Sequence, residues 1–216
     1  DSWRERELET IEVRREPQGK GSSLRVVTVS AQSKEVESRG RAPEEGRAPV
    51  RIDAEPLALW AARMEMAKVS EEPFFILHLL SGRWIILYTQ NGMILHANHL
   101  PRGDGAPPQE EGKRLSGQLE RIARVMGHGD GMQDLPIELS GEPADILEGV
   151  EDGLVNDGWG SVQQFSPSRK FRRQFKRKER FPVSHMIALG IALRQMASAQ
   201  GAPLLNFSRV LSTDQR

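Results

Sequence analysis

Three apolar segments separated by two polar steps occupy the middle of the chain. They form the stretch FFILHLLSGRWIILYTQNGMILHANHLPRG, residues 74–103. Short apolar runs bounded by turn-forming residues are typical of buried strands, so we expect strands at 74–80, 84–90 and 93–99. Asn and Gly tolerate positive φ, and the QNG step therefore predicts a tight hairpin between the last two strands.

The chain on either side of this stretch alternates between strand and helix patterns. Before it, ELETIEVRRE and LRVVTVSA predict a hairpin within residues 7–31, and DAEPLALWAARMEMAKV predicts a helix. After it, KRLSGQLERIARVM predicts a helix, LPIEL a strand, PADILEGVEDGL a helix and HMIALGIALRQMASA a last helix. The apolar face of the KRLSGQLERIARVM helix is expected to hold Leu115, Leu119, Ile122 and either Val125 or Met126. Residues 74–150 are thus predicted to run β-β-β-α-β-α, which indicates an α/β fold on a mixed sheet, with loops at 101–112 and 127–134.

Composition excludes several classes of protein. Lys plus Arg and Asp plus Glu both number 30, so the chain of 216 residues carries no net charge that would steer it towards nucleic acid or a membrane. There is no Cys, which excludes disulfides, thiolate metal sites and cysteine nucleophiles. No apolar run approaches the roughly 20 residues of a membrane span, and no signal peptide is visible. We therefore expect a protein of a reducing compartment.

The order of the segments resembles that of a known fold. Three hairpin-connected strands followed by alternating helix and strand are similar to one half of an actin-like (ribonuclease H-like) fold. Six stretches then resemble, in order, the actin-like cytoplasmic platform proteins of type IV pilus and type II secretion machines, PilM and GspL. These stretches are LRVVTVSAQSKEVES, APVRIDAEPLALWAAR, the three-strand stretch, LPIELSGEPADILEGVEDGL, HMIALGIALR and PLLNF.

The resemblance implies a domain organisation and a cellular setting. Residues 1–54 would be an inserted α+β subdomain, 55–72 a connecting helix, and 73–216 the second actin-like half with a basic insertion at 166–182. The first strand and phosphate loop of the family's other half are not found in the sequence. The resemblance also implies a cytoplasmic protein at the inner membrane, bound to a PilN/PilO-like membrane-anchored partner or to its own membrane segment, with the motor ATPase as a further partner. Homo-oligomerisation is left open.

The nucleotide loops that the resemblance implies look degraded. Aligned on the strands, the position of the Mg²⁺-binding Asp falls on His78, and the phosphate loop continues through Ser81, Gly82 and Arg83. Imidazole is a poor ligand for Mg²⁺, which prefers oxygen ligands. The bulk of Leu80 and Trp84 would obstruct close phosphate approach. The second loop keeps Ser140 and Gly141, but Glu142 and Pro143 replace further glycines. We therefore expect no ATPase activity and no cofactor, although ATP with Mg²⁺ and an anion at Arg83 stay as less favoured alternatives.

Neither the histidines nor any short motif predicts other chemistry. His96 and His99 are three apart in a strand and should point to opposite faces, and His78 lies on another strand. We therefore expect no metal site. GHGDG, with His128 and Asp130, is expected to be a flexible turn. There is no GxSxG, HExxH or Walker A motif.

A basic segment is the sharpest local signal. Residues 169–180 hold eight Lys or Arg and one Glu, interleaved with phenylalanines. This pattern could dock on a partner groove, an anionic lipid or a nucleic acid, or could be a solvated loop. We favour lipid or an acidic partner over nucleic acid, because the resemblance implies a place beside the membrane. The residues assigned to this surface are Arg169, Lys170, Phe171, Arg172, Arg173, Phe175, Lys176, Arg177 and Lys178.

PLLNF, residues 203–207, is the second candidate for partner binding. Leu204, Leu205 and Phe207 offer apolar anchors and Asn206 an amide, which suits strand addition to a partner groove, although a terminal strand on the chain's own core is an equal alternative. The main hypothesis is a non-catalytic scaffold of a pilus or secretion platform. The alternatives are an ATP-binding pilus assembly protein and a lipid- or nucleic-acid-binding module acting through residues 169–180.

Overall fold

The computed structural model describes most of the chain in nine stretches, and all structural statements below concern these residues. They are residues 6–18, 21–32, 54–68, 70–80, 82–103, 105–129, 131–141, 143–173 and 185–199. The chain divides into two compact units, one of residues 1–58 with 191–216 and one of residues 59–190. Each unit is described by itself.

The first unit contains a long two-stranded hairpin. Strands β1 (Arg6–Gln18) and β2 (Gly21–Gln32) pair antiparallel, with an irregularity in register between Glu12 and Arg14. The hairpin predicted within residues 7–31 is confirmed.

The second unit is built on a five-stranded mixed sheet. Its strands are β3 (Phe74–Leu80), β4 (Arg83–Gln90), β5 (Met93–Pro101), β6 (Ile137–Gly141) and β7 (Val162–Gln164), in the order β5-β4-β3-β6-β7. β4 is antiparallel to both β3 and β5, whereas β6 is parallel to β3 and β7 is parallel to β6. Only β4 therefore runs against the others. This confirms the mixed sheet and the β-β-β-α-β-α order expected from the sequence.

The apolar runs of β3 and β4 have a simple cause. Both strands lie in the middle of the sheet and are buried on both faces, so they do not alternate. β5 lies at the described edge of the sheet and is more exposed. The QNG turn takes positive φ at Asn91 (53°) and Gly92 (71°), as expected for a tight hairpin.

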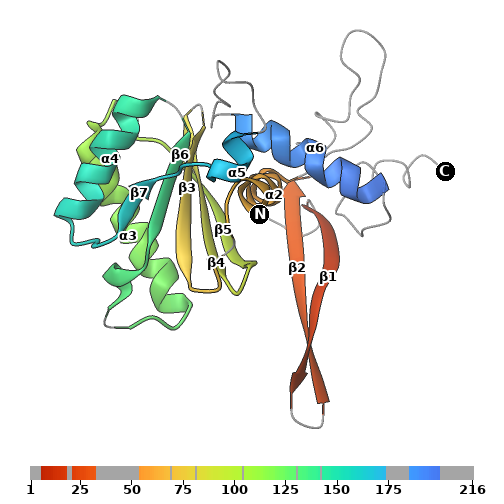
Figure 1. The fold of residues 1–216 in the computed structure, drawn as a ribbon. Helices are drawn as coiled ribbons and strands as arrows, with labels where there is room; N and C mark the ends of the chain where they lie inside the picture. Colours follow the sequence, from red (N-terminus) through yellow and green to blue (C-terminus); the bar gives the residue numbers. More distant parts are fainter. Residues whose placement is uncertain are drawn as a thin grey trace. The chain divides into compact units, whose positions relative to one another are not determined.

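Helices cover both faces of the sheet (Figure 1). α3 (Pro108–Val125) and α4 (Ala144–Asn156) pack on one face over the first core, which includes Leu77, Leu115, Leu119 and Trp159. The second core, on the other face, joins the sheet to α2 (Glu55–Met66), α5 (Arg169–Arg172) and the first residues of α6 (Met186–Ala199).

Helix α3 begins five residues earlier than its apolar pattern predicts. Pro108 stands in the first turn, where a missing N–H costs nothing, and Glu110 and Glu111 follow. The PPQEEG part of the predicted loop at 101–112 is therefore largely helix. Of the two alternatives for the end of the apolar face, Met126 packs on the first core and Val125 is 78% exposed.

Three short elements were not expected from the sequence. The loop predicted at 127–134 contains a 3₁₀ turn, η2 (Met132–Asp134). β7 and α5 are too short to show a period. No described helix is both long enough and apolar enough to span a membrane.

Candidate functional site

The carboxyl ends of the parallel strands β3 and β6 lie side by side, and this edge brings together both loops that the resemblance singled out. His78 on β3 is paired in register with Ser140 on β6. Their side chains are hydrogen-bonded, with His78 Nδ1 2.8 Å from Ser140 Oγ, and both residues are buried. Ser140 Oγ also lies 3.5 Å from the carbonyl oxygen of Leu77, so the hydroxyl can donate there while it accepts from Nδ1. The two residues thus form a buried cross-strand polar pair.

The predicted phosphate loop is a two-residue hairpin turn. β3 and β4 stay paired up to Leu80 and Arg83, which leaves only residues 81 and 82 in the turn. Gly82 has φ +78° there, and Ser81 lies outside the described residues. Leu80 is partly buried and packs on the second core. Its side chain therefore contributes to packing at the end of the strand.

Trp84 does not add bulk at this turn, and that expectation is wrong. Its side chain is fully buried in the first core. The indole Nε1 donates a 2.9 Å hydrogen bond to Glu111 Oε1 on α3. Trp84 therefore faces α3 and supports that helix.

Packing requires a glycine at position 141, at the end of β6. Its φ is +113°, a conformation that L side chains rarely adopt. A Cβ at this position would lie 2.2 Å from the carbonyl oxygen of Leu79 on the neighbouring strand. The close approach of β6 to β3 thus explains why residue 141 is a glycine.

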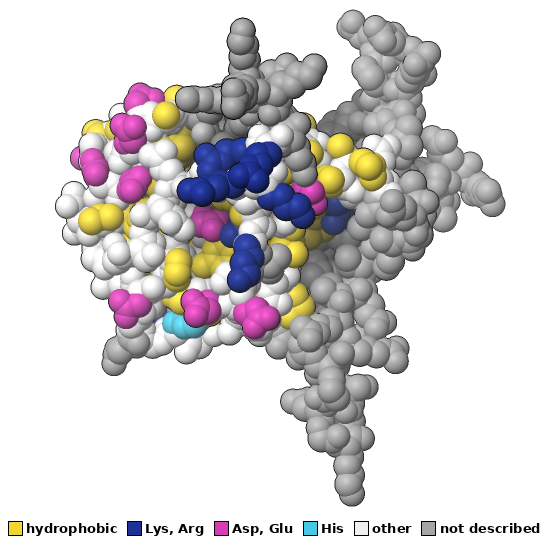
Figure 2. All heavy atoms as spheres, viewed as in Figure 1, with side chains coloured by type: hydrophobic (Ala, Val, Ile, Leu, Met, Phe, Trp, Pro, Cys, Tyr) yellow, Lys and Arg dark blue, Asp and Glu magenta, His cyan; other side chains and the backbone are white. Residues whose placement is uncertain are grey.

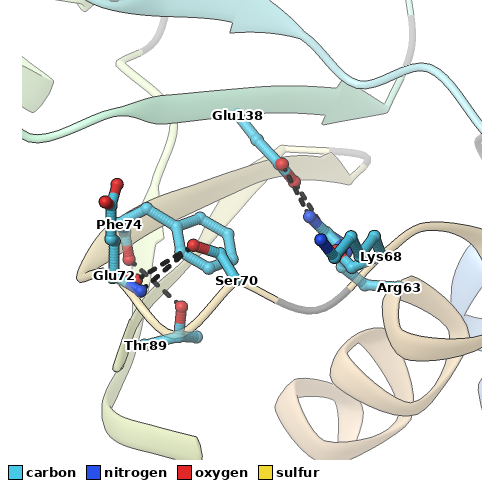
Figure 3. Close-up of polar contacts among 7 residues, drawn as sticks. All are labelled: Arg63, Lys68, Ser70, Glu72, Phe74, Thr89 and Glu138. Carbon is cyan, nitrogen blue, oxygen red and sulfur yellow. Dashed lines mark hydrogen bonds and ion pairs between the residues drawn. The ribbon is translucent and has the colours of Figure 1, made fainter. Parts of the chain in front are cut away.

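The one carboxylate on β3 and β6, that of Glu138, is already paired with an arginine. Glu138 lies two residues before Ser140 and on the same face of β6. Its two oxygens accept from Nε and Nη2 of Arg63 on α2, both at 2.8 Å (Figure 3). Such a bidentate pair satisfies both oxygens with fixed geometry, so Glu138 is not an available Mg²⁺ ligand in this arrangement.

Arg63 is held from several sides. It is 4% exposed, and its Nη1 donates to the carbonyl oxygen of Lys68 at 2.9 Å. The guanidinium lies 5.4 Å from the ring centre of Phe74 and 5.7 Å from that of Phe165. Cation–π attraction therefore adds to the ion pair in joining α2 to the sheet.

A second buried carboxylate, Glu111, lies at the start of α3. It accepts from Trp84, from Nε of Arg114 at 2.8 Å and from the backbone N–H of Gly103 at 3.3 Å. Burial by itself raises the pKa of Glu111, but the hydrogen bonds and charge of Arg114, with those of Trp84 and Gly103, outweigh it and hold the pKa below its usual value. In turn, Glu111 raises the pKa of Arg114.

Sequence reasoning missed both of these carboxylate clusters. For the Arg63–Glu138 pair the available signal was a single charge inside an apolar run: Arg63 within LALWAAR and Glu138 within PIEL. A single charged residue in a segment predicted to be buried requires a partner. Pattern alone did not say which residue that partner would be.

The histidines do not form a site. His96 is paired with Tyr88 on the face of the first core, whereas His99 is paired with Ile85 on the face of the second, as the strand spacing predicts. His128, expected in a flexible turn, has its Nε2 2.5 Å from the Tyr88 hydroxyl, and burial raises the pKa of that tyrosine. Within the described stretches, no group of three or more His, Cys, Asp or Glu is arranged to hold a metal ion.

The basic segment is described only in its first part. Arg169, Lys170, Arg172 and Arg173 are exposed at α5, and Lys and Arg side chains gather over this helix in Figure 2. Phe171, predicted to face a partner, is 4% exposed and belongs to the second core. Phe175, Lys176, Arg177 and Lys178 lie outside the described residues, as do Leu204, Leu205, Asn206 and Phe207.

Comparison with known proteins gives a fold but no sequence family. The sequence matches no protein-family model and none of the curated proteins with which it was compared. Among solved structures, a chain of the "PilM-PilN type IV pilus biogenesis complex" is similar at a TM-score of 0.60 and 18% identity, over 89% of this chain and 67% of that one.

Two further solved structures are similar at lower scores. A protein of unknown function with an actin-like ATPase fold from Bacteroides thetaiotaomicron gives a TM-score of 0.45 at 10% identity, over 76% of this chain and 55% of that one. The ethanolamine utilization protein EutJ from Carboxydothermus hydrogenoformans gives 0.38 at 16% identity, over 64% and 53%. This chain thus spans about half the length of these two proteins.

The pilus structure and the strand order together decide the fold. The five-stranded sheet has the order β5-β4-β3-β6-β7 with only β4 reversed, and its elements follow the β-β-β-α-β-α order that resembles one half of an actin-like fold. The likeness to the PilM–PilN chain extends over most of the protein. At this level of identity the likeness establishes the fold alone. The chain has an actin-like α/β fold.

Proposed function

We propose that this protein is a non-catalytic scaffold of a type IV pilus or type II secretion platform, which binds a membrane-anchored partner. The proposal has two supports of different kinds. The fold is similar to that of a chain from the PilM–PilN complex, and that chain assembles with a partner protein. The residues at the carboxyl ends of β3 and β6 make contacts with each other that serve packing.

The second support carries the non-catalytic part of the proposal. Hydrolysis of a nucleotide needs a metal with oxygen ligands and backbone that can approach phosphate closely. At the carboxyl ends of β3 and β6, His78 is hydrogen-bonded to Ser140. Glu138 accepts hydrogen bonds from Arg63 with both of its oxygens. These contacts would have to break before either residue could serve a nucleotide, which argues against ATP as a substrate.

Calorimetry of the full-length protein with ATP and Mg²⁺ tests this part. We expect no saturable heat of binding. In a parallel hydrolysis assay we expect no phosphate release above a buffer blank. Saturable binding that depends on Mg²⁺ would overturn the proposal in favour of an ATP-binding assembly protein. If a weak signal appears, a Gly82→Ala variant tests whether the turn between β3 and β4 causes it. A Cβ at this position meets no atom within 4 Å, although the positive φ is strained.

Partner binding is tested separately. The full-length protein and the cytoplasmic segment of the membrane-anchored pilus or secretion protein from the same organism are expected to form a complex of defined stoichiometry, measured by calorimetry or light scattering. Absence of a complex with every such segment would remove the scaffold assignment, even if ATP binding is also absent.

A further inference from the structure

Helix α5 presents a dense positive charge on a surface that is fixed to the protein core. Arg169, Lys170, Arg172 and Arg173 are all exposed, within five consecutive residues. None of the four forms an ion pair with another residue in the described part of the chain. They differ in this from Arg63 and Arg114, which are paired with Glu138 and Glu111 within the fold.

The geometry of the turn separates the charges from the core. Successive residues of a helix are rotated by about 100°, so the four basic residues cover an arc of roughly 160° on one side. Phe171 lies at the centre of the opposite side, where it is 4% exposed in the second core. The turn is therefore amphipathic, with an apolar anchor directed inward and a wholly cationic face directed outward.

The turn is also held in place at its start. Ser168 Oγ accepts from the N–H of Phe171 at 3.2 Å and so caps the helix. The N–H of Ser168 in turn donates to the carbonyl oxygen of Met66, at the end of α2, at 2.8 Å. Because backbone, cap and anchor are all fixed, the four cations are held together on one surface of the domain.

We propose that this cationic face of α5 binds the surface of an anionic phospholipid bilayer. Four to eight clustered Lys and Arg are the usual number for attraction to acidic headgroups. The sequence just beyond the described turn keeps the local charge positive: residues 169–180 carry eight basic side chains and one acidic one. Since the whole chain has no net charge, this attraction is local and should orient the protein on the membrane.

Nucleic acid and an acidic protein fit the surface less well. Single-stranded nucleic acid is bound by basic residues together with exposed aromatic rings, and the aromatic residue of this turn is buried. An acidic protein would exploit the planar fork of arginine for bidentate contacts. A fluid bilayer needs only charge density, which a mixture of Arg and Lys supplies. This inference goes beyond the proposed scaffold function and does not depend on it.

Vesicle sedimentation with matched variants tests the proposal. Full-length protein is mixed with vesicles of phosphatidylcholine alone, or with about one third phosphatidylglycerol, at low salt and at about 0.15 M salt. The test variant is Lys170→Gln/Arg172→Gln/Arg173→Gln. The control, Lys113→Gln/Arg121→Gln/Arg124→Gln, removes the same side chains from exposed positions of α3 on the other face of the sheet.

We expect the wild type and the control to bind only the acidic vesicles, more weakly as salt rises. Each Lys or Arg at such a surface contributes about fivefold to partitioning, so the test variant should lose at least about tenfold. The substituted side chains are exposed, and unchanged circular dichroism would confirm that the variants fold. Equal loss in both variants, equal binding to neutral vesicles, or no vesicle binding by the wild type would each overturn the proposal.

A charge-preserving variant separates the bilayer from a specific anion partner. Arg172→Lys/Arg173→Lys keeps the charge but removes the guanidinium forks. Binding to acidic vesicles should stay within about twofold of the wild type. Loss of binding in this variant, or tighter binding of the wild type to duplex DNA than to the vesicles at the same salt, would contradict a bilayer and indicate the other partner class.

Discussion

The imidazole of His78 and the hydroxyl of Ser140 lie 2.8 Å apart on the neighbouring parallel strands β3 and β6, near their carboxyl ends. His78 is fully buried and Ser140 is 3% exposed. A buried polar pair of this kind is stabilising only while both members are present, because each one satisfies the other. If the edge has a structural role, substitutions here should affect stability.

Replacing Ser140 by Ala tests this role. The substitution removes the hydroxyl beside Nδ1 of a fully buried histidine, so we expect the free energy of unfolding in urea to fall by about 1–3 kcal/mol. The control is Ser161→Ala, an exposed position, which should stay within about 0.5 kcal/mol of the wild type. Equal stability of both variants would show that the pair contributes nothing to the fold.

Gly141→Ala should be more damaging than its size suggests. The new Cβ would lie 2.2 Å from the carbonyl oxygen of Leu79 and would be held at φ +113°. We expect a loss of about 3 kcal/mol or more, since backbone must shift to relieve the contact.

The matched control is Gly117→Ala in α3, where a Cβ meets nothing within 4 Å. Alanine is a better helix former than glycine, so this variant should be as stable as the wild type or up to about 1 kcal/mol more stable. A Gly141→Ala protein as stable as the control would refute the packing explanation for Gly141.

The sequence predicts the elements of the fold much better than the contacts of the candidate site. Apolar runs and turn residues predict all three antiparallel strands to within two residues, because β3 and β4 are buried on both faces and Asn91 and Gly92 suit the turn. The short strand β7 gave no signal, because three residues cannot show a period.

The contacts of the site depend on register and therefore could not be predicted. Nothing in the local pattern sets His78 opposite Ser140, 62 residues later, or Arg63 against Glu138, 75 residues later. The prediction for Trp84 is wrong because it did not take into account that successive side chains of a strand point to opposite faces of the sheet. Trp84 pairs with Leu79, and both side chains belong to the first core.

The ion pair of Arg63 and Glu138 should be costly to break from either side. Arg63→Met leaves a carboxylate without its bidentate partner, and Glu138→Gln leaves a buried guanidinium, so each should destabilise by about 3–5 kcal/mol. The double variant Arg63→Met/Glu138→Gln combines the same two substitutions, removes both charges together and should be more stable than the sum of the single effects indicates. Urea unfolding of the four proteins gives the coupling energy.

The exposed pair of Arg124 and Glu120 on α3 provides the comparison. Its atoms lie 3.3 Å apart, and the Arg124 side chain is 64% exposed. Surface pairs are worth about 0–1 kcal/mol, so Arg124→Ala should have little effect. Similar costs for the two pairs would mean that the Arg63–Glu138 contact does not fasten α2 to the sheet.

Glu111 should make part of the stability depend on acid pH. Hydrogen bonds from Arg114, Trp84 and Gly103 hold its pKa in the folded protein below the usual value of a carboxyl group, against the opposing effect of burial. The unfolded chain therefore binds a proton more readily than the folded one as the pH falls. The stabilisation is complete above the ordinary carboxyl pKa of about 4.3 and is lost progressively as the pH falls through the lower folded value.

Glu111→Gln removes this titration and keeps the shape of the side chain. At pH 7 we expect the variant to be less stable by about 1–3 kcal/mol, because a charge-assisted contact with Arg114 is lost. Between about pH 5 and pH 3 its unfolding free energy should fall less steeply than that of the wild type, so the two curves converge in acid. Glu110→Gln, at the exposed neighbouring position, controls for the loss of one acidic residue. Parallel curves for the Glu111→Gln protein and the wild type would show that the acid sensitivity comes from other carboxylates.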